Sequence, residues 1–287
     1  MPSIAPYALE PGAEVLAGPV YLAGAGDSRV IAVPLDRAEG WTKTVAFGTD
    51  TYYTSPCQRV RIANALESHY GGWTIAFAED PLGVPDWITT FDRNTPAEAI
   101  AAFTGTLVEG LETGSADCRR GGKQYTGDSP AALLAERGWE ALPGARPHHR
   151  QVSPDGRAAY RIRSGRVHEF DELLDPEKSM WRMSAGLDPL NTSAWQAYFS
   201  SATPTHLIAA SAAVLADPTP VTRQAHWIPE RHRLLVNVQL PSTEQPASRP
   251  SAALARSSFA EKASATRQPS AAHTTAPVLS TASRRQR

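Results

Sequence analysis

The chain has 287 residues, a net charge of −1 and 41% hydrophobic residues, values typical of one or two globular domains. No stretch approaches the roughly 18 consecutive apolar residues of a membrane helix, and the first residues lack the basic and apolar regions of a signal peptide, so we expect a cytoplasmic protein with no membrane partner. Cys57 and Cys118 are the only cysteines. Two are too few for a disulfide framework or for a zinc site made of cysteines alone.

Along the chain, a set of glycines, Ser-Pro pairs and large aromatic residues occurs twice in the same order. The first set is Gly40-Trp41, Ser55-Pro56, Trp73, Trp87, Phe91 and Thr95-Pro96, and the second is Gly138-Trp139, Ser153-Pro154, Trp181, Trp195, Phe199 and Thr203-Pro204. The copies are offset by 98 residues up to Arg59 and Arg157, and by 108 residues from Trp73 and Trp181 onward. One insertion of ten residues, placed within 163–178, explains the step. The pattern indicates a tandem duplication.

The duplication divides the chain into six parts. We predict an N-terminal extension (1–29), repeat 1 (30–112), a linker (113–127), repeat 2 (128–219), a basic loop with a final strand (220–240, the strand within 233–240) and a tail (241–287). The tail carries seven basic and two acidic residues and is rich in Ser, Ala, Pro and Thr. Its composition predicts disorder, because it has too few apolar residues to bury.

Each repeat has the pattern of short strands followed by a helix. In the first, residues 59–62, 73–78 and 87–91 alternate larger and smaller side chains with the period of a strand. Thr95-Pro96-Ala97-Glu98 then predicts a helix that begins with a capping box. Another helix is expected from Ser129 as N-cap and Pro130 to Gly138 as terminator. The fold class is α+β: two repeats, each a short antiparallel sheet of about four to five strands covered by a C-terminal helix, packed as a pseudo-twofold pair.

A Ser-Pro turn begins the strands in each copy. Ser153-Pro154-Asp155-Gly156 is a favourable hairpin turn, and Ser55-Pro56-Cys57-Gln58 is a weaker version. Together with the tryptophan strands and the helix begun by Thr-Pro, over residues 30–219, this pattern resembles the SPDY-type domain of actinomycetes, a domain of unknown function often found in tandem. Cys57 departs from the family's preferred Asp. The resemblance implies the architecture and an association with mobile elements and regulatory genes, and it implies no reaction, cofactor or catalytic residue.

The densest basic cluster follows the second repeat. It interleaves cationic and aromatic residues, as a nucleic-acid groove does: Arg223, His226, Trp227, Arg231, His232 and Arg233. The competing interpretation is a solvated loop, which we favour because residues 1–240 carry a net charge of −6.

Three other groups of residues are candidates for metal binding or chemical reactivity. His148-His149-Arg150 lacks the additional ligands of a metal site, so we expect a loop. The acidic insertion does not match a calcium loop and is expected to be a charged surface excursion. Cys57 would be reactive if Arg59 and Arg61 lowered its pKa, but the interpretation as a tolerated substitution is favoured. We therefore expect no metal site, no cofactor and no catalytic residue.

From the sequence, we expect a non-enzymatic binding or adaptor protein with a macromolecular partner. Duplicated units provide two similar surfaces and a groove between them, which suits such a partner. The alternative is a nucleic-acid-binding accessory or regulatory protein, such as one of a mobile element, which would use the tail and the cluster at 223–233. The identity of the partner and the oligomeric state are left open.

Overall fold

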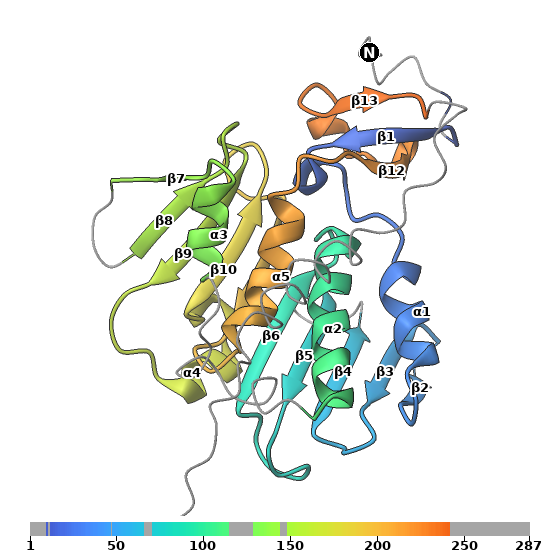
Figure 1. Cartoon of the computed structure of the whole chain (residues 1–287), viewed down its shortest axis with the longest axis vertical. Helices are drawn as coiled ribbons and strands as arrows, with labels where there is room; N and C mark the ends of the chain where they lie inside the picture. The colour runs from blue at the N-terminus through green and yellow to red at the C-terminus, as the bar shows by residue number, and fades with distance from the viewer. Residues whose placement is uncertain are drawn as a thin grey trace, which may run out of the picture.

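The computed structural model describes residues 10, 12–46, 48–65, 71–114, 129–143 and 148–241. In these ranges the chain is an α+β protein with a ten-stranded antiparallel sheet, a three-stranded sheet and a layer of helices (Figure 1). No helix in the described ranges is long and apolar enough to span a membrane. The predicted tail from residue 242 onward and the predicted linker from residue 115 onward lie outside the described residues.

The ten-stranded sheet takes five strands from each half of the chain. The first half supplies β2 (Thr42–Ala46), β3 (Asp50–Thr54), β4 (Val60–Ala65), β5 (Gly72–Phe77) and β6 (Trp87–Asp92). The second half supplies β7 (Glu140–Ala141), β8 (His148–Val152), β9 (Ala158–Arg163), β10 (Trp181–Ala185) and β11 (Trp195–Phe199). The strands that side-chain alternation predicted in repeat 1 are β4, β5 and β6.

The two halves share one sheet, which corrects the expectation of a separate sheet for each repeat. The strand order is β2-β3-β4-β5-β6-β11-β10-β9-β8-β7, so the halves meet where β6 pairs antiparallel with β11. In this pairing Phe91 lies opposite Ala197, and Thr90 lies opposite Tyr198. The last strand of each repeat would otherwise leave a row of unpaired backbone groups at a sheet edge, and the pairing satisfies them.

Four helices form one layer against the sheet. They are α1 (Arg29–Arg37), α2 (Ala97–Glu112), α3 (Pro130–Glu136) and α5 (Thr205–Leu215). α2 and α5 lie side by side over the central strands (Figure 1). Phe103 of α2 packs edge-on to Phe91 of β6, with ring centroids 5.6 Å apart, and lies 6.0 Å from Phe199 of β11. The conserved spacing of aromatic residues in the two copies therefore builds one shared core.

The predicted capping box at the start of α2 is wrong. α2 begins at Ala97 without a side-chain cap. The Thr95 hydroxyl instead donates to the Gln196 carbonyl oxygen at 3.4 Å, and Glu98 forms an ion pair with Arg223. The prediction for α3 is confirmed, since the Ser129 hydroxyl accepts from the Ala132 amide at 3.1 Å and Gly138 adopts a φ of 82° after the helix. The Thr95 hydroxyl and the Glu98 carboxylate therefore bind partners that are 101 and 125 residues away in the sequence.

The two Ser-Pro turns have the same backbone geometry. Ser153 and Ser55 are buried, and each hydroxyl accepts from the amide five residues on, that of Ala158 at 2.8 Å and that of Val60 at 3.0 Å. Where the second turn has a glycine, the first has Gln58 with a φ of 59°. This left-handed conformation is one that residues other than glycine rarely adopt. The serines are therefore turn residues in both copies.

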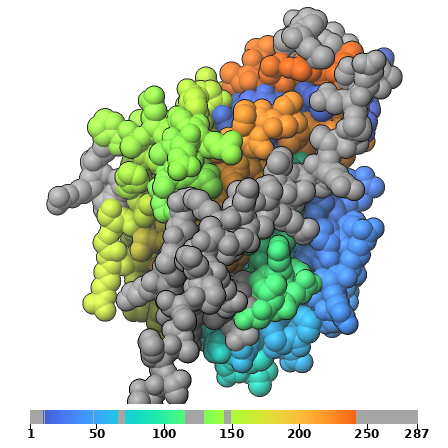
Figure 2. Space-filling model, in the orientation of Figure 1, coloured from blue at the N-terminus to red at the C-terminus, as the bar shows by residue number. Residues whose placement is uncertain are grey.

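The termini of the described region form a second sheet, which the sequence did not predict. β1 (Glu14–Gly18) lies between β12 (Val221–Gln224) and β13 (Asn237–Gln239). Of the strand predicted in 233–240, only β13 is extended in a sheet. In Figure 2 the blue N-terminal segment lies among the orange C-terminal atoms at the top. Segments about 200 residues apart thus fold together.

The segment after β1 docks on the second repeat. It forms the 3-10 turn Val20–Leu22, whose residues are buried. The Tyr21 hydroxyl donates to Asp155 Oδ1 at 2.8 Å, and its carbonyl oxygen accepts from Trp195 Nε1 at 2.9 Å. Burial, with the nearby Asp155 carboxylate, raises the pKa of Tyr21 well above its usual range, although a contact with Ser153 opposes this. Residues 14–22 of the N-terminal extension are therefore part of the folded body.

Candidate anion-binding face

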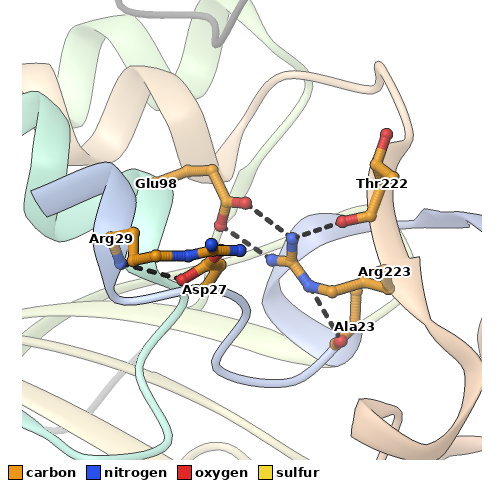
Figure 3. Close-up of polar contacts among 6 residues, drawn as sticks. All are labelled: Ala23, Asp27, Arg29, Glu98, Thr222 and Arg223. Carbon is orange, nitrogen blue, oxygen red and sulfur yellow. Dashed lines mark hydrogen bonds and ion pairs between the residues drawn. The ribbon is translucent and has the colours of Figure 1, made fainter. Parts of the chain in front are cut away.

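The predicted basic cluster is divided by the fold, and Arg223 lies inside it. Arg223 is 2% exposed and forms a bidentate ion pair with Glu98 of α2, at 2.6 and 2.7 Å (Figure 3). Its remaining donors reach the carbonyl oxygens of Ala23 and Thr222, at 3.2 and 3.0 Å. Arg223 thus ties the three-stranded sheet to α2. This buried guanidinium makes four hydrogen bonds within the protein, so it does not belong to an exposed phosphate-binding surface.

His232 is the second internal member of the cluster. Its Nδ1 donates to the Leu22 carbonyl oxygen at 3.2 Å, and its buried Nε2 has no hydrogen-bond partner. Burial lowers the pKa of His232; the Leu22 carbonyl opposes this effect and the Arg231 charge adds to it. His226 and Arg231 are exposed, while Trp227 and Arg233 are half-buried. The six residues therefore do not form one continuous basic surface.

The other sequence candidates also take structural places. His149 and Arg150 lie on strand β8, so the loop expected there is wrong. The insertion forms α4 (Glu169–Leu174) and a 3-10 turn (Pro176–Lys178), and Glu172 within it is fully buried. Its carboxylate accepts from the Met180 amide and from the Ser201 amide and hydroxyl. Glu172 is therefore a buried residue that binds the backbone of Met180 and Ser201, and it is not part of a solvent-exposed surface segment.

Cys57 is exposed in the first Ser-Pro turn. Partial burial raises the pKa of its thiol, but a hydrogen bond with the Ser55 hydroxyl, backbone amides and the Arg59 charge outweigh this, so the net pKa lies below the usual range. The Cys57 Sγ lies 3.3 Å from the Ser55 Oγ. Asp155 makes the equivalent contact with Ser153, at 2.6 Å. Cys57 thus keeps the turn contact of the aspartate. Within the described residues, no group of three or more His, Cys, Asp or Glu is arranged to hold a metal ion.

A row of arginines, which the sequence analysis missed, crosses the second half of the sheet. Arg150 of β8 lies opposite Arg161 of β9, which lies opposite Arg182 of β10, which lies opposite Tyr198 of β11. Successive side chains of a strand point to opposite faces. The neighbouring positions in register, among them Tyr160 and Met183, are buried in the core beneath the helices, so the arginines point to the face away from α2 and α5. We call Arg150, Arg161 and Arg182 the arginine row.

The arginine row lacks the partners that buried cations normally have. Among the described residues, no carboxylate forms an ion pair with any of its members. The Nε atoms of Arg150 and Arg182 are buried and have no hydrogen-bond partner in the part of the chain that the structure describes. Burial lowers the pKa of Arg161, and repulsion from Arg182, Arg150 and Arg163 adds to this, while Tyr198 opposes it. Like charges directly opposite each other destabilise a sheet, and unpaired buried donors cost free energy. Such an arrangement suits an anion that brings negative charge and acceptors.

The side chains that surround the row position it. The Arg182 guanidinium lies over the Tyr198 ring at 5.7 Å from its centroid and donates to the Ser193 hydroxyl at 3.3 Å. Arg163 lies two residues after Arg161 on β9 and on the same face of the sheet. It donates to the Lys178 carbonyl oxygen at 3.0 Å. The Tyr198 ring and the Ser193 hydroxyl hold the Arg182 side chain near the sheet without neutralising its charge. No ion pair among the described residues would have to break for a negatively charged group to approach the row.

The first half of the sheet has different residues at the same positions. At the offsets of 98 and 108 residues, the counterparts of Arg150, Arg161, Arg182 and Tyr198 are Tyr52, Ala63, Thr74 and Thr90. They continue the same register line across β3, β4, β5 and β6. The arginines of the row are 11 and 21 residues apart in the chain, so no local cluster of basic residues marks them. A residue-by-residue comparison of the two copies would have found it.

The fold and this face define a class of protein: an α+β chain of two repeats fused through one sheet, with a cationic surface on one half. A family model named SPDY, domain of unknown function (DUF317), matches residues 54–110 and 152–221. The chain therefore carries the SPDY domain twice, as the sequence pattern indicated. No curated protein and no solved structure matches the chain.

Proposed function

We propose that this protein is a non-enzymatic binding protein in which the two SPDY domains form a scaffold and the face opposite α2 and α5 receives a negatively charged macromolecular partner. The observation that carries the proposal is the arginine row. The repeats share the residues that build turns and core, and they differ at four consecutive register positions on one face. If only one copy of a duplicated scaffold carries a binding surface, the two copies must differ at the residues of that surface.

Three carboxylates that could act in chemistry have structural contacts instead, which supports a binding role. Asp155 accepts from Tyr21 and Ser153 and organises a turn. Glu98 holds Arg223, and Glu172 holds the backbone after the insertion. Each carboxylate has its acceptors occupied by groups that maintain the fold. The arginine row differs from them, since none of its arginines forms an ion pair with a carboxylate among the described residues.

The two halves also provide an approximate twofold arrangement that suits an extended partner. In each half, the five strands follow one another in chain order from the outer edge of the sheet to the central β6–β11 pair. The register line therefore continues without interruption from the charged half to the hydroxyl-rich half. A partner longer than one repeat would contact both halves.

Affinity capture with matched variants tests the proposal. Full-length protein and its Arg161→Gln/Arg182→Gln variant would each be immobilised, and macromolecules retained from a bacterial extract would be identified and quantified. The control variant is Arg231→Gln/His226→Gln, which alters the exposed members of the cluster at 223–233. We expect a partner that is lost with the row variant and kept with the control. An unchanged set of retained macromolecules with the row variant would refute the proposed binding face.

A further inference from the structure

We propose that the partner of the arginine row is a single-stranded nucleic acid, whose phosphates lie along the register line across the sheet. This inference rests on the proposed function, because it assigns a chemical class to the partner of the same face. Three features carry it: the type of cation, the spacing of the charges and the residues that continue the line.

The three cations of the row are arginines, and two of them have an unsatisfied Nε donor among the described residues. A guanidinium offers a planar set of N–H donors that matches the oxygens of a phosphate. The buried Nε atoms of Arg150 and Arg182 have no hydrogen-bond partner among the described residues. A phosphodiester lying over the row would supply the missing negative charge. It would also relieve the repulsion among the three guanidiniums.

The spacing of the row suits a polymer of regular charge. Adjacent strands of a sheet are about 4.8 Å apart, so the arginines of β8, β9 and β10 span about 10 Å. The line from Arg150 to Tyr52 crosses eight strands and spans about 34 Å, the length of about ten stacked nucleotides or of fewer in an extended strand. One chain of phosphates can therefore follow the line from one repeat into the other.

The continuation of the line has the chemistry of a nucleic-acid surface. Thr74 and Tyr52 are half-buried and bring hydroxyl groups, which hydrogen-bond to phosphate and sugar oxygens, whereas Tyr198 and Thr90, between them and the arginine row, are each only 7% exposed. Tyr52 is half-buried on β3, and a partly exposed ring can stack on a base. An acidic peptide would instead need pockets for its alternate side chains. The hydroxyl-rich half thus favours nucleic acid.

The half-buried position of the arginines favours a single strand over a duplex. Their side chains lie close to the sheet and have little reach beyond it. A duplex is a stiff cylinder, and it would meet a sheet face along a narrow line. A single strand is flexible and can turn successive phosphates toward the row. Because the chain has a net charge of −1, we expect local, salt-sensitive binding of modest affinity.

Fluorescence anisotropy with the full chain tests the inference. The probe is a labelled oligothymidylate of about 20 nucleotides, titrated at several salt concentrations from about 50 mM upward. We expect the logarithm of the affinity to fall with the logarithm of the salt concentration with a slope of about −2 to −3, for three to four phosphate contacts of a single strand. Arg161→Gln/Arg182→Gln should weaken binding by about tenfold or more and flatten the slope by about 1.4.

Two further variants keep the test independent of folding and of the basic C-terminal residues. Arg61→Gln is the loss control, because Arg61 lies on the same face of the first repeat, outside the row, and donates to the Pro81 carbonyl oxygen. Thr74→Arg, at the position equivalent to Arg182, should tighten binding several-fold, whereas Thr74→Gln should not. All variants retain residues 241–287, so any change in affinity reports on the sheet face. Matching circular dichroism spectra and denaturation midpoints would establish that the variants are folded.

The outcomes separate this inference from the proposed function. Oligothymidylate binding that is unaffected by Arg161→Gln/Arg182→Gln would overturn the inference, as would the absence of binding at about 50 mM salt. Tighter, row-dependent binding of duplex DNA or polyglutamate would also overturn it, and would leave an anion-binding face in place. If captured partners are lost with the row variant but survive nuclease treatment, the proposed function stands and the nucleic-acid assignment fails.

Discussion

The ion pair between Glu98 and Arg223 gives the sharpest prediction about stability. Glu98→Gln preserves the size of the side chain and leaves the Arg223 guanidinium, which is 2% exposed, without its counter-charge. Two charge-assisted hydrogen bonds at 2.6 and 2.7 Å are replaced by one neutral acceptor. Removal of one partner of a buried pair costs about 3–5 kcal/mol, and we expect the lower end of this range because Gln still accepts one bond.

The predicted loss is large enough to measure in several ways. A cost of about 3 kcal/mol corresponds to a melting temperature about 6–12 °C lower for a folded region of this size. Urea unfolding followed by tryptophan fluorescence would give the change in free energy directly. The pair links α2 to β12, so we also expect faster proteolysis within the three-stranded sheet, which could be located by mass spectrometry.

A matched pair of variants decides whether burial is the cause. Arg29→Gln breaks the ion pair with Asp27, in which the arginine side chain is 80% exposed, and should lower the melting temperature much less than Glu98→Gln because solvent screens the pair. Glu98→Leu/Arg223→Met removes both charges and should destabilise less than Glu98→Gln alone, since no uncompensated charge stays buried. The reasoning is refuted if Glu98→Gln costs no more than Arg29→Gln.

Three further predictions follow from the contacts around the termini and the Ser-Pro turns. Because burial lowers the pKa of His232, the unfolded chain binds its proton more readily, so stability should fall as the pH drops below about 6.5 and His232→Gln should flatten this dependence in urea unfolding. Tyr21→Phe removes the hydroxyl donor to Asp155 and should cost about 0.5–1.5 kcal/mol, whereas a cost near zero would show that the contact contributes nothing. Cys57→Asp introduces the residue of the second turn, where Asp155 accepts from the Arg157 amide at 3.0 Å, and should leave the melting temperature unchanged or higher while removing the thiol label at position 57. A clear destabilisation by Cys57→Asp would mean that the two turns are not equivalent.

Much of the local structure could be predicted because its causes lie within a few residues. Alternation of side chains located β4, β5 and β6, and Ser129 with Gly138 located the ends of α3. The Ser-Pro pairs located the turns, and their recurrence revealed the two SPDY domains. In each case the residue's own backbone preference, or a hydrogen bond across a few residues, is enough to determine the conformation.

The candidate site could not be predicted in the same way. Arg150, Arg161 and Arg182 belong to three strands and become neighbours only when the register of the sheet is set. Arg223 was assigned to a surface cluster from its neighbours in the chain, and its true partner, Glu98, is 125 residues away. The sequence places charges in the chain, but solvent exposure and pairing depend on which elements pack together.

By itself, the sequence determined the duplication, the Ser-Pro turns, strands β4, β5 and β6 and the ends of α3, because short-range sterics and hydrogen bonds act within each repeat. Only the tertiary structure decided that β6 and β11 join the repeats into one sheet, that the termini close a second sheet around β1, and that the arginines align. These features depend on long-range strand pairing, in which backbone groups of any two strands are chemically equivalent. The choice among partners is made by the packing of the whole core, which no short segment encodes.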